Sequence, residues 1–134
     1  MRQVVAKRLA ARGMSIDEVI TPAALELLAR ASGGVMRELI RSFRDAATSA
    51  QLLDQMQINE SIAQDVIDEQ RLEIAPQLNA DYREALRRVL EQGAPSGGKY
   101  ETLEDDLLRG LHLLSYQDEK HFWFDAHPNV LPLL

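Results

Sequence analysis

The sequence predicts a mainly α-helical chain that ends in a β-hairpin. Apolar residues recur at helical spacing through most of the first 110 positions. Capping residues stand before several of these stretches, and glycine follows others, as at the two ends of helices. After Gly110, two short runs of apolar and aromatic residues flank a polar turn, which is typical of a hairpin. We therefore expect a helical domain over residues 1–75 and a domain of two helices and a two-stranded wing over 76–134.

Four helices are expected in the first domain. Gly13 ends the first of them, which carries Val4, Val5 and Leu9. The second begins at Thr21-Pro22, because threonine caps a helix and proline fits its first turn. The third spans about 35–53, and Asn59 caps the fourth, whose apolar side is formed by Ile62, Ala63, Val66 and Ile67.

The boundary between the domains is expected near Ile74–Leu78, where Pro76 interrupts any continuation of the fourth helix. Asn79 caps a fifth helix, and the loop 93–98 separates it from a sixth over about 103–110. The strands are placed at 113–116 and 121–124, with the turn at 117–120.

The composition of the chain excludes several kinds of site and of protein. The chain has 134 residues and no cysteine, so disulfides and thiolate metal sites are excluded. No apolar run approaches the roughly 18 residues that cross a bilayer, and the N-terminal residues lack the apolar block of a signal peptide. We expect a soluble cytoplasmic protein with no membrane partner.

The net charge of −6 is unevenly distributed. Residues 1–50 contain eight Lys/Arg and five Asp/Glu, whereas 51–134 contain seven and sixteen. The acidic second part is a poor candidate for a sequence-independent grip on a phosphate backbone.

The segment from Gly33 to Arg37 has the features of an anion-binding helix start. Gly33 and Gly34 permit a sharp reversal, because glycine adopts positive φ without steric cost. The free N–H groups and the positive dipole end of the helix favour an anion, and Arg37 adds a guanidinium group in the first turn. The alternative is an exposed arginine that pairs with Glu38 or Asp45.

A second glycine-rich segment nearly fits the phosphate-binding loop G-x-x-x-x-G-K-[ST]. Residues 93–100 depart from it at Tyr100, where a hydroxyl residue should reach Mg²⁺, and Pro95 removes one N–H group. A helix also precedes the loop where a strand is needed. We interpret this segment as an exposed linker between helices.

No catalytic constellation is visible in the sequence. His112, His121 and His127 match no compact metal-ligand spacing, and we expect ordinary surface or core histidines, with His121 pointing outward on a strand. There is no evident nucleophile–base pair or paired-carboxylate motif. We therefore expect no metal site and no enzyme activity from this chain alone.

The arrangement expected for residues 79–134 resembles a short winged-helix unit. In a DNA-binding version, the helix before the wing would enter the major groove. Here that helix carries acidic residues that would face phosphate and repel it, and the wing tip adds Asp118 and Glu119; the acidic residues of the helix are Glu101, Glu104, Asp105 and Asp106. Arg83, Arg87 and Arg88 could form a small basic patch, although solvated charge is the favoured interpretation.

Three consecutive aromatic residues, Phe122, Trp123 and Phe124, occupy the second strand. Because side chains alternate along a strand, at least one of them points away from the inner face. The favoured interpretation is that the small domain covers both sides of its wing. The alternative is that Phe122 and Trp123 anchor a partner, with Arg83 and Arg87 as further contacts.

The order of these features resembles the C-terminal region of AAA+ ATPases, a helical lid followed by a winged-helix domain, as found in prokaryotic ATPases and more distantly in origin-recognition initiators. Ile20–Arg37 is similar to the lid segment that ends in Gly-x-x-Arg, Ile58–Val66 to the last lid helix, and Trp123–Pro128 to the terminal segment. The resemblance covers nearly the whole sequence, and its Gly-Gly-x-x-Arg segment is the most specific part.

The resemblance implies that Arg37 is the sensor-2 arginine, which reaches the γ-phosphate of ATP bound by a neighbouring core domain. Gly33 and Gly34 would contribute with it to binding the ATP phosphates, only when that core domain is present. The chain lacks a complete P-loop, an acidic strand end and parallel strands, which phosphoryl transfer needs. We therefore expect a regulatory, non-catalytic part of an ATPase, either a fragment or a reduced homologue. It would partner an upstream AAA+ core domain and, through its wing, a protein or less readily a nucleic acid. The alternatives are a free-standing winged-helix DNA-binding regulator and a helical protein-interaction adaptor.

Overall fold

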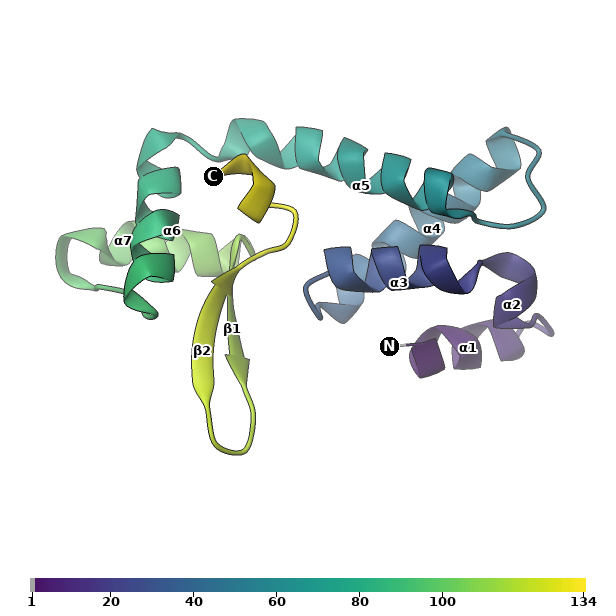
Figure 1. The fold of residues 1–134 in the computed structure, drawn as a ribbon, viewed down its shortest axis with the longest axis horizontal. Coiled ribbons are helices and arrows are strands. Elements are labelled where there is room, and N and C mark those ends of the chain that lie inside the picture. The colour runs from purple at the N-terminus through teal and green to yellow at the C-terminus, as the bar shows by residue number, and fades with distance from the viewer. Residues whose placement is uncertain (1) are drawn as a thin grey trace. The chain divides into compact units, whose positions relative to one another are not determined.

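A computed structural model describes residues 2–134 and is mainly helical, with one two-stranded antiparallel hairpin near the C-terminus (Figure 1). The mainly α-helical class and the C-terminal hairpin are therefore confirmed. The chain forms two compact units, Met1–Gln70 and Arg71–Leu134, which we describe separately.

The first unit is built from helices only. Its elements are α1 (Arg2–Ala10), α2 (Ile16–Val19), α3 (Pro22–Ala31), α4 (Met36–Leu52) and α5 (Glu60–Ile74), the last of which contributes its residues up to Gln70.

The expected helix starts are confirmed at Thr21 and Asn59. The Thr21 side chain accepts a hydrogen bond from the Ala24 N–H (3.2 Å), and the Asn59 side chain accepts one from the Ile62 N–H (2.9 Å). Each side chain satisfies a donor that a helix leaves unpaired in its first turn.

Helix α2 was not expected from the sequence. It has only four residues, too few to show a helical period. Long-range pairing holds the segment after it, because the Ile58 N–H donates to the Val19 carbonyl (2.8 Å) and the Thr21 N–H donates to the Ile58 carbonyl (3.0 Å). Such pairing joins residues almost forty positions apart and leaves no local sequence signal.

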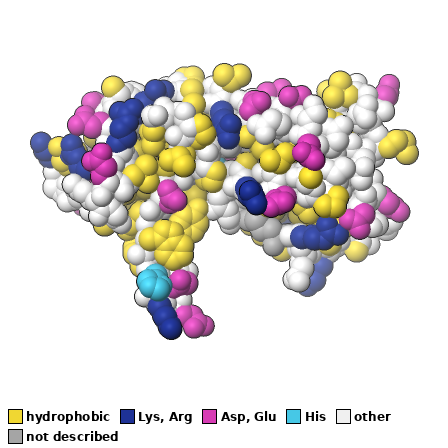
Figure 2. Space-filling view, in the orientation of Figure 1, with side chains coloured by type: hydrophobic (Ala, Val, Ile, Leu, Met, Phe, Trp, Pro, Cys, Tyr) yellow, Lys and Arg dark blue, Asp and Glu magenta, His cyan; other side chains and the backbone are white. Residues whose placement is uncertain are grey.

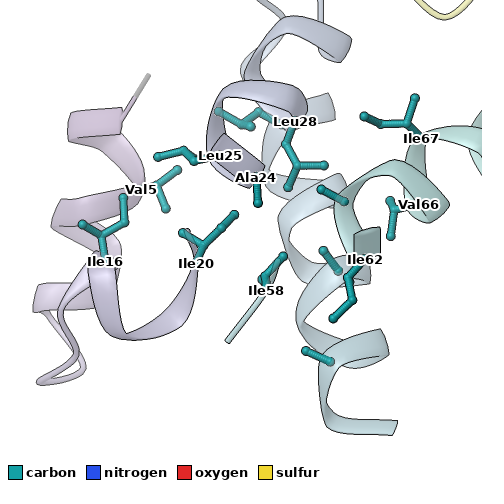
Figure 3. Packing of buried hydrophobic residues seen from close by; sticks show 14 of the residues in the cluster. Val5, Ile16, Ile20, Ala24, Leu25, Leu28, Ile58, Ile62, Val66 and Ile67 are labelled. Atoms are coloured by element: carbon teal, nitrogen blue, oxygen red, sulfur yellow. The ribbon is translucent and has the colours of Figure 1, made fainter. Parts of the chain in front are cut away.

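The core of the first unit collects the apolar sides of all five helices (Figure 3). Leu28 is fully buried, and Ile20 and Ile58 are 1% exposed. The apolar residues expected on the fourth predicted helix, Ile62, Ala63, Val66 and Ile67, are all buried in this cluster.

The second unit contains two α-helices and the hairpin. Its elements are a 3₁₀ turn (Ala75–Gln77), α6 (Ala80–Gln92), a 3₁₀ turn (Gly98–Tyr100), α7 (Glu101–Arg109), β1 (Leu113–Gln117), β2 (Phe122–Ala126) and a 3₁₀ turn (Leu131–Leu133). Its core is formed by Leu78, Ala85, Leu86, Val89, Leu107, Leu113 and Val130.

Both ends of α6 follow the sequence. The Asn79 side chain accepts a hydrogen bond from the Tyr82 N–H (2.9 Å), and Gly93 ends the helix at φ +79°. Helix α7 begins at Glu101, two residues before the expected Leu103, because the 3₁₀ turn at Gly98–Tyr100 leads directly into it.

The hairpin pairs Leu113 with Ala126 and Gln117 with Phe122. β1 is one residue longer than expected, β2 begins one residue later and ends two residues later than expected, and the turn begins at Asp118 instead of Gln117. The reason is the Asp118 carboxylate, whose Oδ1 accepts hydrogen bonds from the N–H groups of Lys120 (2.8 Å) and His121 (2.6 Å). An aspartate that accepts from backbone two and three residues ahead fixes the position of a turn.

Candidate functional site

The glycine pair reverses the chain between α3 and α4. Gly33 and Gly34 have φ values of +62° and +84°, in the left-handed region that glycine adopts without steric cost. The Val35 N–H donates to the Ser32 carbonyl (3.0 Å) and closes the turn. Helix α4 then begins at Met36, which places Arg37 in its first turn, as the sequence predicts.

The start of α4 has no side-chain cap. Helices α3, α5 and α6 are each preceded by a side chain that accepts a first-turn N–H, but α4 is preceded by Val35, which has no acceptor. Helix α7 also lacks such a cap, but it continues from a 3₁₀ turn. The first-turn amides of α4 are therefore available to an acceptor from outside, and the helix dipole favours a negatively charged one.

Arg37 is exposed beside these amides. Within residues 2–134 its guanidinium group makes no hydrogen bond or ion pair, so the pairing with Glu38 or Asp45 is not formed there. Asp45 instead lies 4.0 Å from the Nε of Arg41, one turn further along α4. The turn thus combines open N–H donors with a guanidinium group that this part of the chain leaves unengaged.

The second glycine-rich segment is occupied by the protein's own carboxylate. Glu104 is 2% exposed, and its two oxygens accept hydrogen bonds from the N–H groups of Ser96 (2.6 Å) and Gly97 (2.7 Å). Two of the N–H donors of this loop are therefore engaged internally. This arrangement agrees with the interpretation of the segment as a linker.

The position of the Glu104 side chain differs from the one that the sequence predicts. The prediction that this side chain would face DNA with the other acidic residues of α7 is wrong, because it points into the second unit, whereas Glu101, Asp105 and Asp106 are exposed. Its neighbours supply the signal that was missed. Leu107 and Leu108 follow it by three and four positions, so the helical period places residue 104 on their buried side.

The three histidines lie in different surroundings. Among residues 2–134, no group of three or more His, Asp or Glu side chains could hold a metal ion. His127 is buried, and its Nδ1 accepts from the Asn129 N–H (3.1 Å). His112 is half-buried, and burial lowers its pKa. The prediction that His121 lies on a strand is wrong, because it is exposed in the turn before β2.

Two of the four aromatic residues of the hairpin are exposed. Phe122 is 61% exposed and Trp123 is 42% exposed, so the expectation that the small domain covers both sides of the wing is wrong for these two residues. Trp123 stacks on Tyr116 across the strands (5.6 Å between centroids), while Phe122 contacts Phe124 edge to face (5.0 Å). Figure 2 shows apolar side chains gathered on the hairpin above a charged tip. Phe124 alone of the three consecutive aromatics packs against the core.

The arginines of α6 do not form one patch. The Arg83 Nε donates to the Leu78 carbonyl (3.0 Å), which ties the start of the helix to the preceding turn. The Arg88 guanidinium lies 3.5 Å from the centroid of the Tyr100 ring and is bonded to Glu84 (3.2 Å). Arg87 is exposed. Two of the three side chains therefore have structural roles.

The exposed side of α7 stays acidic, and one of its carboxylates is hydrogen-bonded. The Tyr82 hydroxyl donates to Asp106 Oδ2 (3.0 Å), and this hydrogen bond to a carboxylate raises the pKa of Tyr82.

No protein-family model, curated protein or solved structure was found to match this chain. Among the described residues, no helix is long and apolar enough to cross a membrane.

Proposed function

We propose that this chain is the C-terminal regulatory region of an AAA+-type ATPase, in which the first unit acts as the lid and Arg37 contacts the γ-phosphate of ATP. The observation that carries the proposal is the start of α4. An uncapped helix start, shaped by Gly33 and Gly34 in the left-handed region, stands beside an exposed arginine without a partner in the described chain. Both features stabilise a bound phosphate.

The proposal assigns most of the nucleotide site to a separate core domain. One arginine and one helix end supply only part of the energy needed to bind ATP, because association itself costs several kcal/mol or more. Phosphoryl transfer also needs groups that hold Mg²⁺ and position the attacking water. The role of this chain would be to report the presence of the γ-phosphate, and the core domain would perform hydrolysis.

The second unit would act as a winged-helix-like module that docks a protein. The exposed pair Phe122 and Trp123 supports this role, since exposed aromatic residues provide strong anchors at protein interfaces. The exposed carboxylates of α7 and of the hairpin tip disfavour a DNA duplex, because they would face its phosphates.

The test is Arg37→Ala in the ATPase formed with the core domain, with Arg41→Ala as a matched control one turn along the same helix. A hydrogen bond to a charged group contributes about 1.5–3 kcal/mol, so we expect hydrolysis or ATP affinity to fall roughly ten- to a hundred-fold. The control should change either quantity less than about threefold, and both variants should keep the wild-type circular dichroism. Equal values for the two variants would contradict the proposal.

A helical adaptor that never meets nucleotide is a second candidate, and the exposure of Phe122 and Trp123 is what favours it. In an adaptor, Phe122→Ser would abolish partner capture while Arg37→Ala would leave every measured function intact. In the ATPase region, Arg37→Ala has the effect stated above. The two variants therefore separate the candidates.

A further inference from the structure

A groove in the first unit has a volume of about 620 Å³, and its lining does not include Arg37. Its walls come from α1, α2, the turn between them and α4. The floor is apolar and includes Met14, Ile40 and Phe43, of which Met14 is 39% exposed and the other two are half-buried. A groove of this size holds several apolar side chains of a ligand.

The charged residues that line the groove are all arginines. Arg8 lies on α1, Arg12 lies in the turn that follows it, and Arg44 lies on α4. All three are exposed, and no Asp or Glu is among the lining residues. The groove therefore combines an apolar floor with positive charge contributed by two separate elements.

We propose that this groove binds an acidic amphipathic helix of a partner protein. Such a helix would place apolar side chains at positions i, i+3, i+4 and i+7 on the floor. Its flanking carboxylates would meet the guanidinium groups, which bind carboxylates through paired hydrogen bonds. The inference is independent of the proposed function, since Arg37 does not line the groove.

The observations favour a helical peptide over other occupants. A nucleic acid backbone has no apolar side to cover the floor, and a lipid with one headgroup offers a single anion to three separate arginines. A second copy is also disfavoured. Among residues 2–134, no helix exposes more than one large apolar side chain, and the apolar side of the acidic helix α7 is buried at Leu107.

The test uses a fluorescein-labelled, side-chain-stapled peptide of about 18 residues, with leucine at the four anchor positions and glutamate around them. A second peptide carries lysine in place of each glutamate. Stapling removes most of the cost of forming the helix on binding. We expect saturable fluorescence anisotropy with the glutamate peptide at low salt and at least about tenfold weaker binding of the lysine peptide.

Two pairs of variants locate the site. Arg12→Glu with Arg44→Glu should weaken binding of the glutamate peptide at least about tenfold and strengthen binding of the lysine peptide. Lys7→Glu with Arg41→Glu makes the same change in net charge outside the groove lining and should have less than a threefold effect. On the floor, Met14→Ser should weaken binding several-fold, whereas Met56→Ser, at a side chain 96% exposed, should not.

Three results would overturn the proposal. They are no saturable binding of the glutamate peptide up to about 1 mM, equal effects of the two charge-reversal pairs, and sedimentation showing that self-association of the chain competes with the peptide. Circular dichroism melting of each variant separates loss of binding from loss of fold, because all four arginine and lysine positions are exposed.

Discussion

Replacing Glu104 with glutamine should loosen the loop between α6 and α7 and destabilise the second unit. The carboxylate accepts two short hydrogen bonds, from the N–H groups of Ser96 (2.6 Å) and Gly97 (2.7 Å). Glutamine has the same shape but only one acceptor oxygen, so one N–H would face an NH₂ donor. A hydrogen bond to a charged group contributes about 1.5–3 kcal/mol.

The expected loss lies at the lower end of that range. The loop is largely exposed at Ser96, so water can satisfy part of the lost bonding. We expect Glu104→Gln to lower the free energy of unfolding by about 1.5–2 kcal/mol, and Glu104→Ala, which removes both acceptors and leaves a void at a buried position, by about 3–4 kcal/mol. For a unit of this size, 1 kcal/mol corresponds to a melting shift of about 4–8 °C.

The assay is urea unfolding followed by the fluorescence of Trp123, the single tryptophan of the chain, which lies in the second unit. Asp105→Asn is the matched control, since it makes the same change in charge at the exposed neighbouring position and should change stability by less than about 0.5 kcal/mol. Hydrogen exchange at Ser96 and Gly97 should also accelerate in Glu104→Gln. The reasoning is refuted if Glu104→Gln and Asp105→Asn have the same stability and the two amides exchange as in the wild type.

Two further predictions concern pH and the core. Burial lowers the pKa of His112 below its ordinary value of 6.5, so the unfolded state binds more protons than the folded state as the pH falls. The contribution of neutral His112 to the stability of the folded state is complete above pH 6.5 and is lost as the pH falls through the lowered pKa. The Trp123-monitored urea midpoint should therefore be lower at pH 5.5 than at pH 7.5, and a drop of equal size in His112→Gln would disprove the link. In the first unit, Leu28→Ala should lower the free energy of unfolding, measured by circular dichroism, by about 3–5 kcal/mol, because Leu28 is fully buried. Leu52→Ala, at a side chain 82% exposed, should cost less than about 0.5 kcal/mol, and similar losses for both would contradict the assigned core.

Most helix ends and the hairpin could be predicted because their signals are local. Thr21, Asn59 and Asn79 each cap a helix through an N–H three residues ahead, which is a relation that the sequence displays directly. The strand ends of the hairpin differ from the prediction by one to two residues, because hydrogen bonds to the Asp118 carboxylate fix the position of the turn. The sequence does not show which of the polar residues in this stretch makes those bonds. Helix α2 could not be predicted, since pairing with Ile58 fixes its end.

In the candidate site, too, some features follow from adjacent residues and others depend on tertiary packing. The turn at Gly33 and Gly34 and the position of Arg37 follow from adjacent residues, and the structure has both where the sequence places them. Arg37 forms no ion pair with Asp45, because Asp45 lies near Arg41 instead. Which arginine Asp45 approaches depends on how the side chains pack, and the sequence does not show it. The exposure of Phe122 and Trp123 depends on how little of the second unit covers the hairpin, which no spacing within the strand reveals.

The sequence by itself determined the helical class, the main helix starts, the C-terminal hairpin and the glycine-led start of α4, because each depends on residues within a few positions of one another. Only the tertiary structure decided that Glu104 closes the second glycine-rich loop, that the hairpin leaves two aromatic residues exposed, and that arginines of α1 and α4 border one apolar groove. These features join side chains from separate elements. Packing, and not local spacing, determines which of those side chains meet.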